Sequence, residues 1–249
     1  MNKKHVFSKP YLVITRPEPG LSETAQKISQ LGWHPLLMPV MKIHTVPFEC
    51  LDMDDLQAII FTSRQAIIPT VEHYIKQNII YQNIPVFTVG DITAQDAKQA
   101  GFVHVISAGK DAVALADLIK QHLSPDKGKL FFPSALGQGQ VLFGLLQKSG
   151  FEVVQHAVYR TEPIQQLSEE FTQQLKLQTI NSVLFFSSET ARFFIELIPT
   201  ALHCYFKSIQ AIGISAKTRK YLEQISWRSI EIAANPNTEE MLCLLKEHS

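Results

Sequence analysis

The stretch Phe61-Thr-Ser-Arg-Gln-Ala66 has a counterpart in the second half of the chain, Phe186-Ser-Ser-Glu-Thr-Ala191. Each stretch follows a short apolar run, at 58–60 and at 183–185, and each opens a segment with helical spacing of apolar residues. A buried strand that turns through Ser and Thr into a helix is typical of α/β proteins. The repeated corner therefore predicts that the chain of 249 residues builds this architecture twice.

The rest of the sequence has the same alternating pattern. Ten apolar runs are predicted strands, at residues 11–14, 34–39, 58–61, 85–89, 103–106, 129–132, 152–159, 182–186, 209–213 and 229–233. Most are separated by segments with helical spacing, such as 21–32 and 140–150. Short strands alternating with helices predict parallel sheets, and ten strands are many for one sheet in a chain of this length. The predicted fold class is therefore α/β, with two five-stranded, doubly wound parallel-sheet domains joined by a two-stranded linker.

A second repeat predicts where the domains meet. The segments 31–47 and 149–163 each contain a helix-ending glycine, Gly32 or Gly150, then a long extended stretch, and each ends at a proline. We expect residues 1–42 plus 164–249 to form a discontinuous α/β domain 1, residues 48–157 to form α/β domain 2, and residues 41–47 and 157–163 to form the linker. With two crossings, the carboxyl edges of both sheets can face a shared cleft, and in open α/β sheets ligands bind at that edge.

The charge balance makes several classes of partner unfavourable. Lys plus Arg and Asp plus Glu both number 23, so no overall field attracts nucleic acid or an anionic membrane. The N-terminal residues lack the apolar core of a secretory signal, and no apolar run reaches the length of a membrane span. We expect a cytoplasmic monomer that acts on a small molecule, with neither a nucleic-acid nor a membrane partner.

Metal and cofactor motifs are missing from the sequence. The cysteines Cys50, Cys204 and Cys243 have no CxxC spacing, and the histidines lack HExxH spacing. We interpret the cysteines as reduced thiols in the core. No complete dinucleotide fingerprint, phosphate-binding P-loop or serine-hydrolase elbow occurs, so no metal and no cofactor is predicted.

Polar corners recur where predicted strands turn into helices, including 14–20, 88–96, 132–140, 211–218 and 234–241. Ordinary helix capping explains any one of them. Their recurrence on one predicted edge favours a binding site, because helix N-termini attract phosphates and carboxylates without needing many basic residues. Tyr159, near the return crossing, has two possible roles: its phenol can donate a proton to a leaving hydroxyl, or its ring can pack at the hinge.

Taken together, these motifs resemble the uroporphyrinogen-III synthase family. The resemblance covers nearly the whole chain in order, through VITRP (13–17), IIFTSRQA (59–66), VGDITA (89–94), VYRTEP (158–163), VLFFSSETA (183–191), AIGISAKT (211–218) and NPNTEEML (235–242). It implies two α/β domains, and an enzyme that closes the linear tetrapyrrole hydroxymethylbilane, inverts ring D through a spiro-pyrrolenine intermediate, and uses no cofactor or metal.

The resemblance also implies roles for individual residues. Tyr159 matches the tyrosine proposed to assist departure of the hydroxyl, and Thr93 matches a cleft-facing threonine. The expected substrate-binding residues are Thr15, Arg16, Thr62, Ser63, Thr93, Ser187, Ser188 and Ser215. Ala216 stands where the family often has threonine, so either Ser215 or Thr218 replaces it.

Two other functions remain open from the sequence. A non-catalytic two-domain binding protein for a small polyanionic ligand would share the two crossings, although most such proteins are exported. A degenerate synthase-like domain with a regulatory role is the second, and the presence of Tyr159 and Thr93 argues against it.

Overall fold

The structure is a computed structural model that describes residues 10–49 and 51–245. The chain forms two compact units. Unit 1 consists of Met1–Lys42 and Glu162–Ser249, and unit 2 consists of Ile43–Thr161. The chain passes from one unit to the other within strand β3 (Met41–Thr45) and returns within strand β8 (Val153–Pro163).

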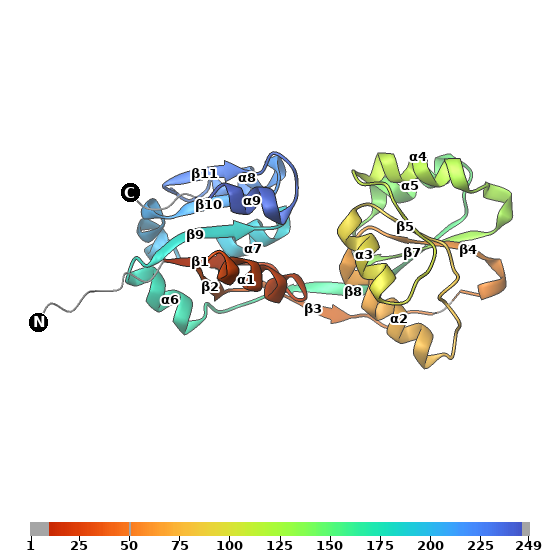
Figure 1. Ribbon diagram of the computed structural model, residues 1–249, viewed down its shortest axis with the longest axis horizontal. Helices are drawn as coiled ribbons and strands as arrows, with labels where there is room; N and C mark the ends of the chain where they lie inside the picture. Colours follow the sequence, from red (N-terminus) through yellow and green to blue (C-terminus); the bar gives the residue numbers. More distant parts are fainter. Residues whose placement is uncertain (1–9, 50, 246–249) are drawn as a thin grey trace, which may run out of the picture. The chain divides into compact units, whose positions relative to one another are not determined.

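Unit 1 contains a parallel sheet of five strands in the order β11-β10-β9-β1-β2 (Figure 1). Its strands are β1 (Tyr11–Ile14), β2 (His34–Leu37), β9 (Ile180–Phe185), β10 (Gln210–Gly213) and β11 (Ser229–Ile232). Its helices are α1 (Gly20–Gln30), α6 (Glu169–Lys176), α7 (Ser188–Leu197), α8 (Ala216–Leu222) and α9 (Thr238–Cys243), with a 3₁₀ segment η4 (Thr200–Ser208).

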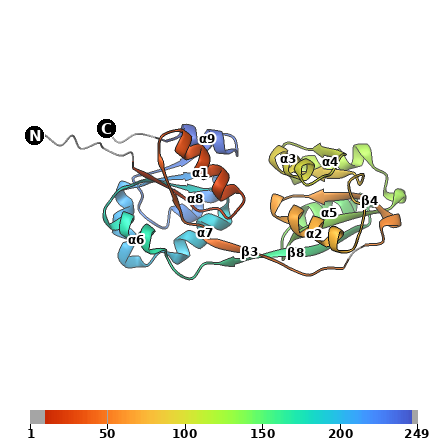
Figure 2. The same cartoon turned by 60° about the horizontal axis from the view of Figure 1, so that its bottom comes forward.

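Helices cover both faces of this sheet. On one face Leu12 and Ile14 of β1 pack with Leu21 and Ile28 of α1 and with Met241 of α9. On the other face, Phe185 of β9 meets Phe194 of α7, with ring centroids 5.2 Å apart. Figure 2 shows α1 and α9 on one side of the strands and α7 on the other. Side chains that alternate along each strand fill both layers, as a doubly wound sheet requires.

Unit 2 contains a sheet of six strands in the order β3-β8-β7-β4-β5-β6. Besides β3 and β8, its strands are β4 (Leu56–Phe61), β5 (Val86–Thr88), β6 (Val105–Ser107) and β7 (Lys129–Ala135). Its helices are α2 (Ile67–Lys76), α3 (Asp91–Gln99), α4 (Ala112–His122) and α5 (Gln140–Lys148), with 3₁₀ turns η1 (Met53–Asp55), η2 (Arg64–Ala66) and η3 (Pro125–Lys127).

Strand β4 shows how this second core divides. Ile59 and Phe61 point into a cluster with side chains of α2 and α3, whereas Ala58 and Ile60 point into a cluster with side chains of α4 and α5. All four residues are fully buried. The near-continuous apolar run that predicted this strand therefore reflects a parallel strand that is covered on both faces.

Strand β3 is the sixth strand, and it runs antiparallel to β8. The N–H of Ile164 donates to the carbonyl of Val40 over 3.0 Å, and the N–H of Val46 donates to the carbonyl of Val158 over 2.9 Å, so the residue order is reversed. The sequence predicted five strands in each sheet because 41–47 was interpreted as linker alone. The predicted α/β class with two doubly wound parallel sheets is confirmed.

One prediction about the core is wrong. Cys204 and Cys243 are free thiols, but both are exposed, so neither belongs to the core. Cys50 lies outside the described residues. Within residues 10–49 and 51–245, no helix combines the length and the apolarity needed to cross a membrane.

Candidate functional site

The strand order locates the expected binding position in unit 1. From β1 the chain moves to β2 on one side, whereas β9 pairs with β1 on the other side. Loops that leave two neighbouring parallel strands in opposite directions open a crevice between them at their carboxyl ends. In unit 1, these are the loops that follow Ile14 of β1 and Phe185 of β9.

Unit 2 reverses its strand order between β4 and β7. The chain runs from β4 through β5 to β6 on one side, and β7 pairs with β4 on the other. The loops that follow Phe61 and Ala135 therefore flank the corresponding position in this unit. The two stretches that begin at Phe61 and Phe186 thus each lie at the switch point of their own sheet.

In the first corner of unit 1, Thr15 and Arg16 have different environments. Thr15 is fully buried, and its Oγ1 donates to the carbonyl of Leu184 over 2.7 Å, which ties β1 to β9. Arg16 is half-buried, and its guanidinium carbon lies 4.4 Å from the centroid of the Phe186 ring. Thr15 therefore supports the corner, and Arg16 offers a cation there.

The corner after β9 is a helix start with a reciprocal cap. Ser187 accepts a hydrogen bond from the N–H of Thr190 over 3.0 Å, and the N–H of Ser187 donates to Oγ1 of Thr190 over 3.1 Å. Ser188 is the first residue of α7 and is half-buried. The hydroxyl of Ser187 is thus committed to capping the helix.

The corner after β10 contains the two residues that could replace the missing threonine. Ser215 precedes α8, is half-buried, and makes no side-chain cap. Thr218 is fully buried, and it packs closely against Gly213: a Cβ added to Gly213 would lie 3.0 Å from the Cβ of Thr218. Ser215 is therefore the more accessible of the two residues.

In unit 2, the predicted residues follow β4 and β5. Ser63 accepts a hydrogen bond from the N–H of Gln65 over 3.3 Å, while Thr62 is half-buried beside it. Thr93 is the third residue of α3 and is also half-buried. β4 and β5 are parallel neighbours, so these corners lie at the same edge of the sheet.

The predicted hydroxyls thus fall into two groups. Thr15, Ser63 and Ser187 have hydrogen-bond partners in the protein. The second group is half-buried, and its hydroxyls make no hydrogen bond within residues 10–49 and 51–245; it consists of Thr62, Thr93, Ser188 and Ser215. A half-buried hydroxyl without a partner in the protein is ready to bind a ligand or water.

Helices α3 and α5 of unit 2 each begin after a glycine and have no side-chain cap. Helix α3 begins after Gly90 and α5 begins after Gly139, and neither glycine has a side chain that could accept the first N–H groups. Gly139 has a φ of 90°, and a Cβ there would lie 2.6 Å from Cζ of Phe132. The open N–H groups of the first turns suit an anionic group.

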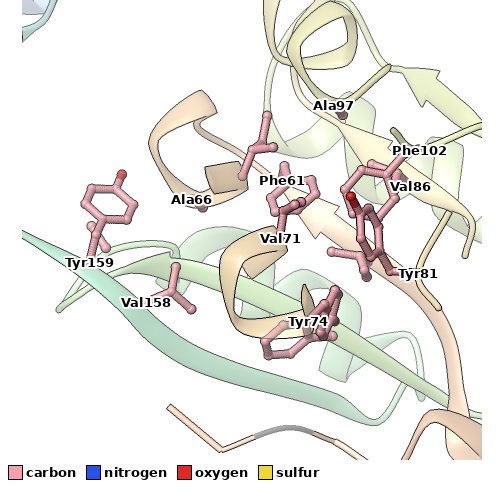
Figure 3. Packing of buried hydrophobic residues seen from close by; sticks show 14 residues of the cluster. Phe61, Ala66, Val71, Tyr74, Tyr81, Val86, Ala97, Phe102, Val158 and Tyr159 are labelled. Carbon is pink, nitrogen blue, oxygen red and sulfur yellow. The ribbon is translucent and has the colours of Figure 1, made fainter. Parts of the chain in front are cut away.

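Tyr159 is on β8 and is 4% exposed. Its carbonyl accepts a hydrogen bond from the N–H of Leu136, so it lies beside the loop that follows β7. Figure 3 shows its ring at the edge of the cluster, separate from the rings of Phe61 and Tyr81. The phenol therefore lies at the end of the core that adjoins the carboxyl edge of unit 2.

Sequence reasoning missed three features of these edges. The Nε of Arg64 lies 2.5 Å from Oδ2 of Asp96, which joins the turn after β4 to α3. Phe186 stacks on Arg16, and Gly20 packs against the same guanidinium. The aromatic residue at the end of the strand predicted at 182–186 was a usable signal, but nothing in the sequence pairs Arg64 with Asp96.

The family model described as "Uroporphyrinogen-III synthase HemD" matches residues 22–243. No curated protein sequence is significantly similar to the chain.

Two solved structures have the same fold. The uroporphyrinogen-III synthetase of Helicobacter pylori is 20% identical, with a TM-score of 0.62 over 94% of this chain and 97% of that one. A mutant uroporphyrinogen III synthase of Thermus thermophilus is 16% identical, with a TM-score of 0.55 over 94% and 96% of the two chains. The family match extends over most of the sequence and favours an enzyme over a non-catalytic binding protein. The chain belongs to the uroporphyrinogen-III synthase family.

Proposed function

We propose that the chain converts hydroxymethylbilane to uroporphyrinogen III with the hydroxyl-bearing corners at the carboxyl edges of its two sheets. The observation that carries the proposal is the group of unpartnered, half-buried hydroxyls, Thr62, Thr93, Ser188 and Ser215. They recur in both units and follow strands at or next to each switch point. The family substrate carries eight carboxylates, and each such corner can hold one of them.

In this proposal, recognition relies more on backbone N–H groups than on basic side chains. The chain has equal numbers of acidic and basic residues, so no excess of cations is available to neutralise eight carboxylates. The uncapped starts of α3 and α5 supply N–H donors and the positive end of the helix dipole. Thr93 adds a hydroxyl at the first of these starts, and Arg16 adds one cation in unit 1.

Tyr159 is the proposed proton donor for the step that removes the terminal hydroxyl of the bilane. The carbon–oxygen bond breaks as the nitrogen of the pyrrole ring that carries the hydroxymethyl group supplies electrons, and the hydroxyl leaves as water with the phenolic proton. The N–H proton of that ring passes to the phenolate, which leaves a neutral azafulvene that the substituted carbon of ring D attacks. Its place beside the loop after β7 supports this role. The remaining task is to hold the flexible bilane so that this carbon reacts first, which is a matter of orientation.

The same proposal includes a cytoplasmic monomer. Cys204 and Cys243 are exposed free thiols, which suits a reducing compartment. Size-exclusion chromatography with light scattering would give the mass in solution, and a mass of 28.1 kDa is expected.

The binding part of the proposal is tested by removing the hydroxyls one at a time. Thr62→Ala, Ser188→Ala and Ser215→Ala should each lower kcat/KM by roughly two- to tenfold, the equivalent of one hydrogen bond of about 0.5–1.5 kcal/mol. Thr172→Ala is the matched control, because Thr172 is a half-buried threonine of α6 whose Oγ1 donates to the carbonyl of Ser168, the residue before the helix. If all four variants behave alike, the corner hydroxyls do not bind the substrate.

A further inference from the structure

Gly20, the first residue of α1, leaves room for the side chain of Arg16. A Cβ on Gly20 would lie 2.2 Å from both Cζ and Nε of Arg16, and 2.5 Å from Nη2. Gly20 is buried, and its φ is not in the left-handed region that favours glycine. The backbone therefore does not need glycine here, and the missing side chain serves to admit the guanidinium.

The Phe186 ring covers the guanidinium from a different part of the chain. Phe186 directly follows β9, and the centroid of its ring is 4.4 Å from Cζ of Arg16. A guanidinium at this distance over an aromatic face is held by the ring quadrupole. Gly20 and Phe186 together restrict the side chain to one place.

That place is the switch point of the sheet in unit 1. Arg16 comes two residues after β1 and Phe186 comes directly after β9, and these two strands are parallel neighbours. The rigid fork of a guanidinium matches the geometry of a carboxylate, which a flexible lysine does not. Ser188, with its unpartnered hydroxyl, begins the next helix two residues after Phe186.

We propose that Gly20 and Phe186 are positioning residues, which fix the Arg16 guanidinium so that it receives one carboxylate of the tetrapyrrole substrate. The inference rests on the proposed function and adds a constraint to it: position 20 must lack a side chain. Gly20 acts only through Arg16, so its substitution should matter only while Arg16 is present.

The test is a double-mutant cycle on Gly20→Ala and Arg16→Ala. Alanine favours a helix more than glycine does, so Gly20→Ala should fold and should melt at the same temperature or higher. Its methyl group displaces the guanidinium, so KM for hydroxymethylbilane should rise about tenfold, with a smaller change in kcat. Arg16→Ala should raise KM by at least as much, and the double variant should match Arg16→Ala alone.

Two further positions separate this effect from a general loss of packing. Gly144→Ala is the matched control, because Gly144 lies within α5 and a Cβ there would meet no atom within 4 Å. It should leave KM unchanged. Phe186→Leu keeps an apolar side chain but removes the aromatic face, so KM should rise. Phe186→Tyr keeps the aromatic face, so its KM should stay near that of the wild-type protein.

Binding of uroporphyrin III, the oxidised product, keeps the inference testable if the enzymatic reaction fails. Its dissociation constant, measured by quenching of tryptophan fluorescence, should follow the same cycle. Two results would overturn the inference: unchanged affinity in Gly20→Ala, or a loss in Gly20→Ala that persists undiminished when Arg16 is already alanine. A wild-type protein that binds uroporphyrin III but forms no isomer III would instead contradict the proposed function.

Discussion

Arg64 and Asp96 form an ion pair at the carboxyl edge of unit 2, with Nε of Arg64 2.5 Å from Oδ2 of Asp96. Their side chains are only 12% and 20% exposed. Arg64 begins the turn that follows Thr62 and Ser63, and Asp96 lies one helical turn after Thr93. The pair therefore joins two corners that the proposed function assigns to carboxylate binding.

We predict that Asp96→Asn lowers the free energy of unfolding by about 2 kcal/mol, because it weakens a charge-assisted hydrogen bond that is largely shielded from water. It should also raise KM, since α3 is no longer held to the turn after β4. Urea unfolding and steady-state kinetics measure the two effects.

The control for this prediction is the exposed pair Arg192–Glu196 on α7, whose side chains are 39% and 56% exposed. Arg192→Gln should cost less than about 0.5 kcal/mol, as exposed pairs one helical turn apart usually do. Equal losses in Asp96→Asn and Arg192→Gln would mean that the Arg64–Asp96 pair is an ordinary surface interaction.

Tyr159→Phe removes the phenolic proton and keeps the ring. If the phenol assists departure of the hydroxyl, kcat should fall by about 10²-fold, which is within the usual range for general acid catalysis. Affinity for uroporphyrin III should change little, because the ring still fills its place in the buried cluster.

Tyr81→Phe is the matched control for that substitution. Tyr81 belongs to the same buried cluster, and its phenol donates to the carbonyl of Ala100 over 2.9 Å. Its loss should lower stability by about 1 kcal/mol without slowing turnover. A Tyr159→Phe enzyme with a normal rate would leave Tyr159 with a packing role.

Substitutions at Thr93 separate side-chain recognition from recognition by the helix start. Thr93→Ala should reduce kcat/KM by roughly tenfold or less, because it deletes one neutral hydroxyl. Thr93→Pro should be worse, because it also removes an N–H of the first turn of α3, and proline is tolerated in a first turn. Thermal melting checks that the proline variant folds. An active Thr93→Pro enzyme beside an inactive Thr93→Ala enzyme would contradict recognition by the backbone.

The sequence predicted the features that depend on neighbours along the chain. The strand predicted at 11–14 is β1, and the two helix-ending glycines, Gly32 and Gly150, have φ values of 78° and 87°. Buried parallel strands appear as apolar runs, and helix ends require local backbone geometry, so short windows of sequence contain both signals.

Features that depend on tertiary contacts could not be predicted in this way. Arg64 and Asp96 are 32 residues apart, and Arg16 meets Phe186 across two strands whose pairing no local pattern specifies. Thr15 illustrates the same limit, because the hydrogen bond from its hydroxyl to the carbonyl of Leu184 joins residues that are 169 positions apart. Whether the hydroxyl of a corner residue is bound within the protein depends on which backbone atoms the fold brings within hydrogen-bond distance of it.

The most direct test is the isomer composition of the product. The purified chain, incubated with hydroxymethylbilane and without added metal or cofactor, should form uroporphyrinogen III, which is identified after oxidation by chromatography of the uroporphyrin isomers. Uncatalysed closure forms isomer I, in which ring D is not inverted, so a reaction without protein gives the baseline. Isomer III in excess over that baseline, in proportion to protein concentration, is the predicted result; isomer I alone at every protein concentration would contradict the synthase function.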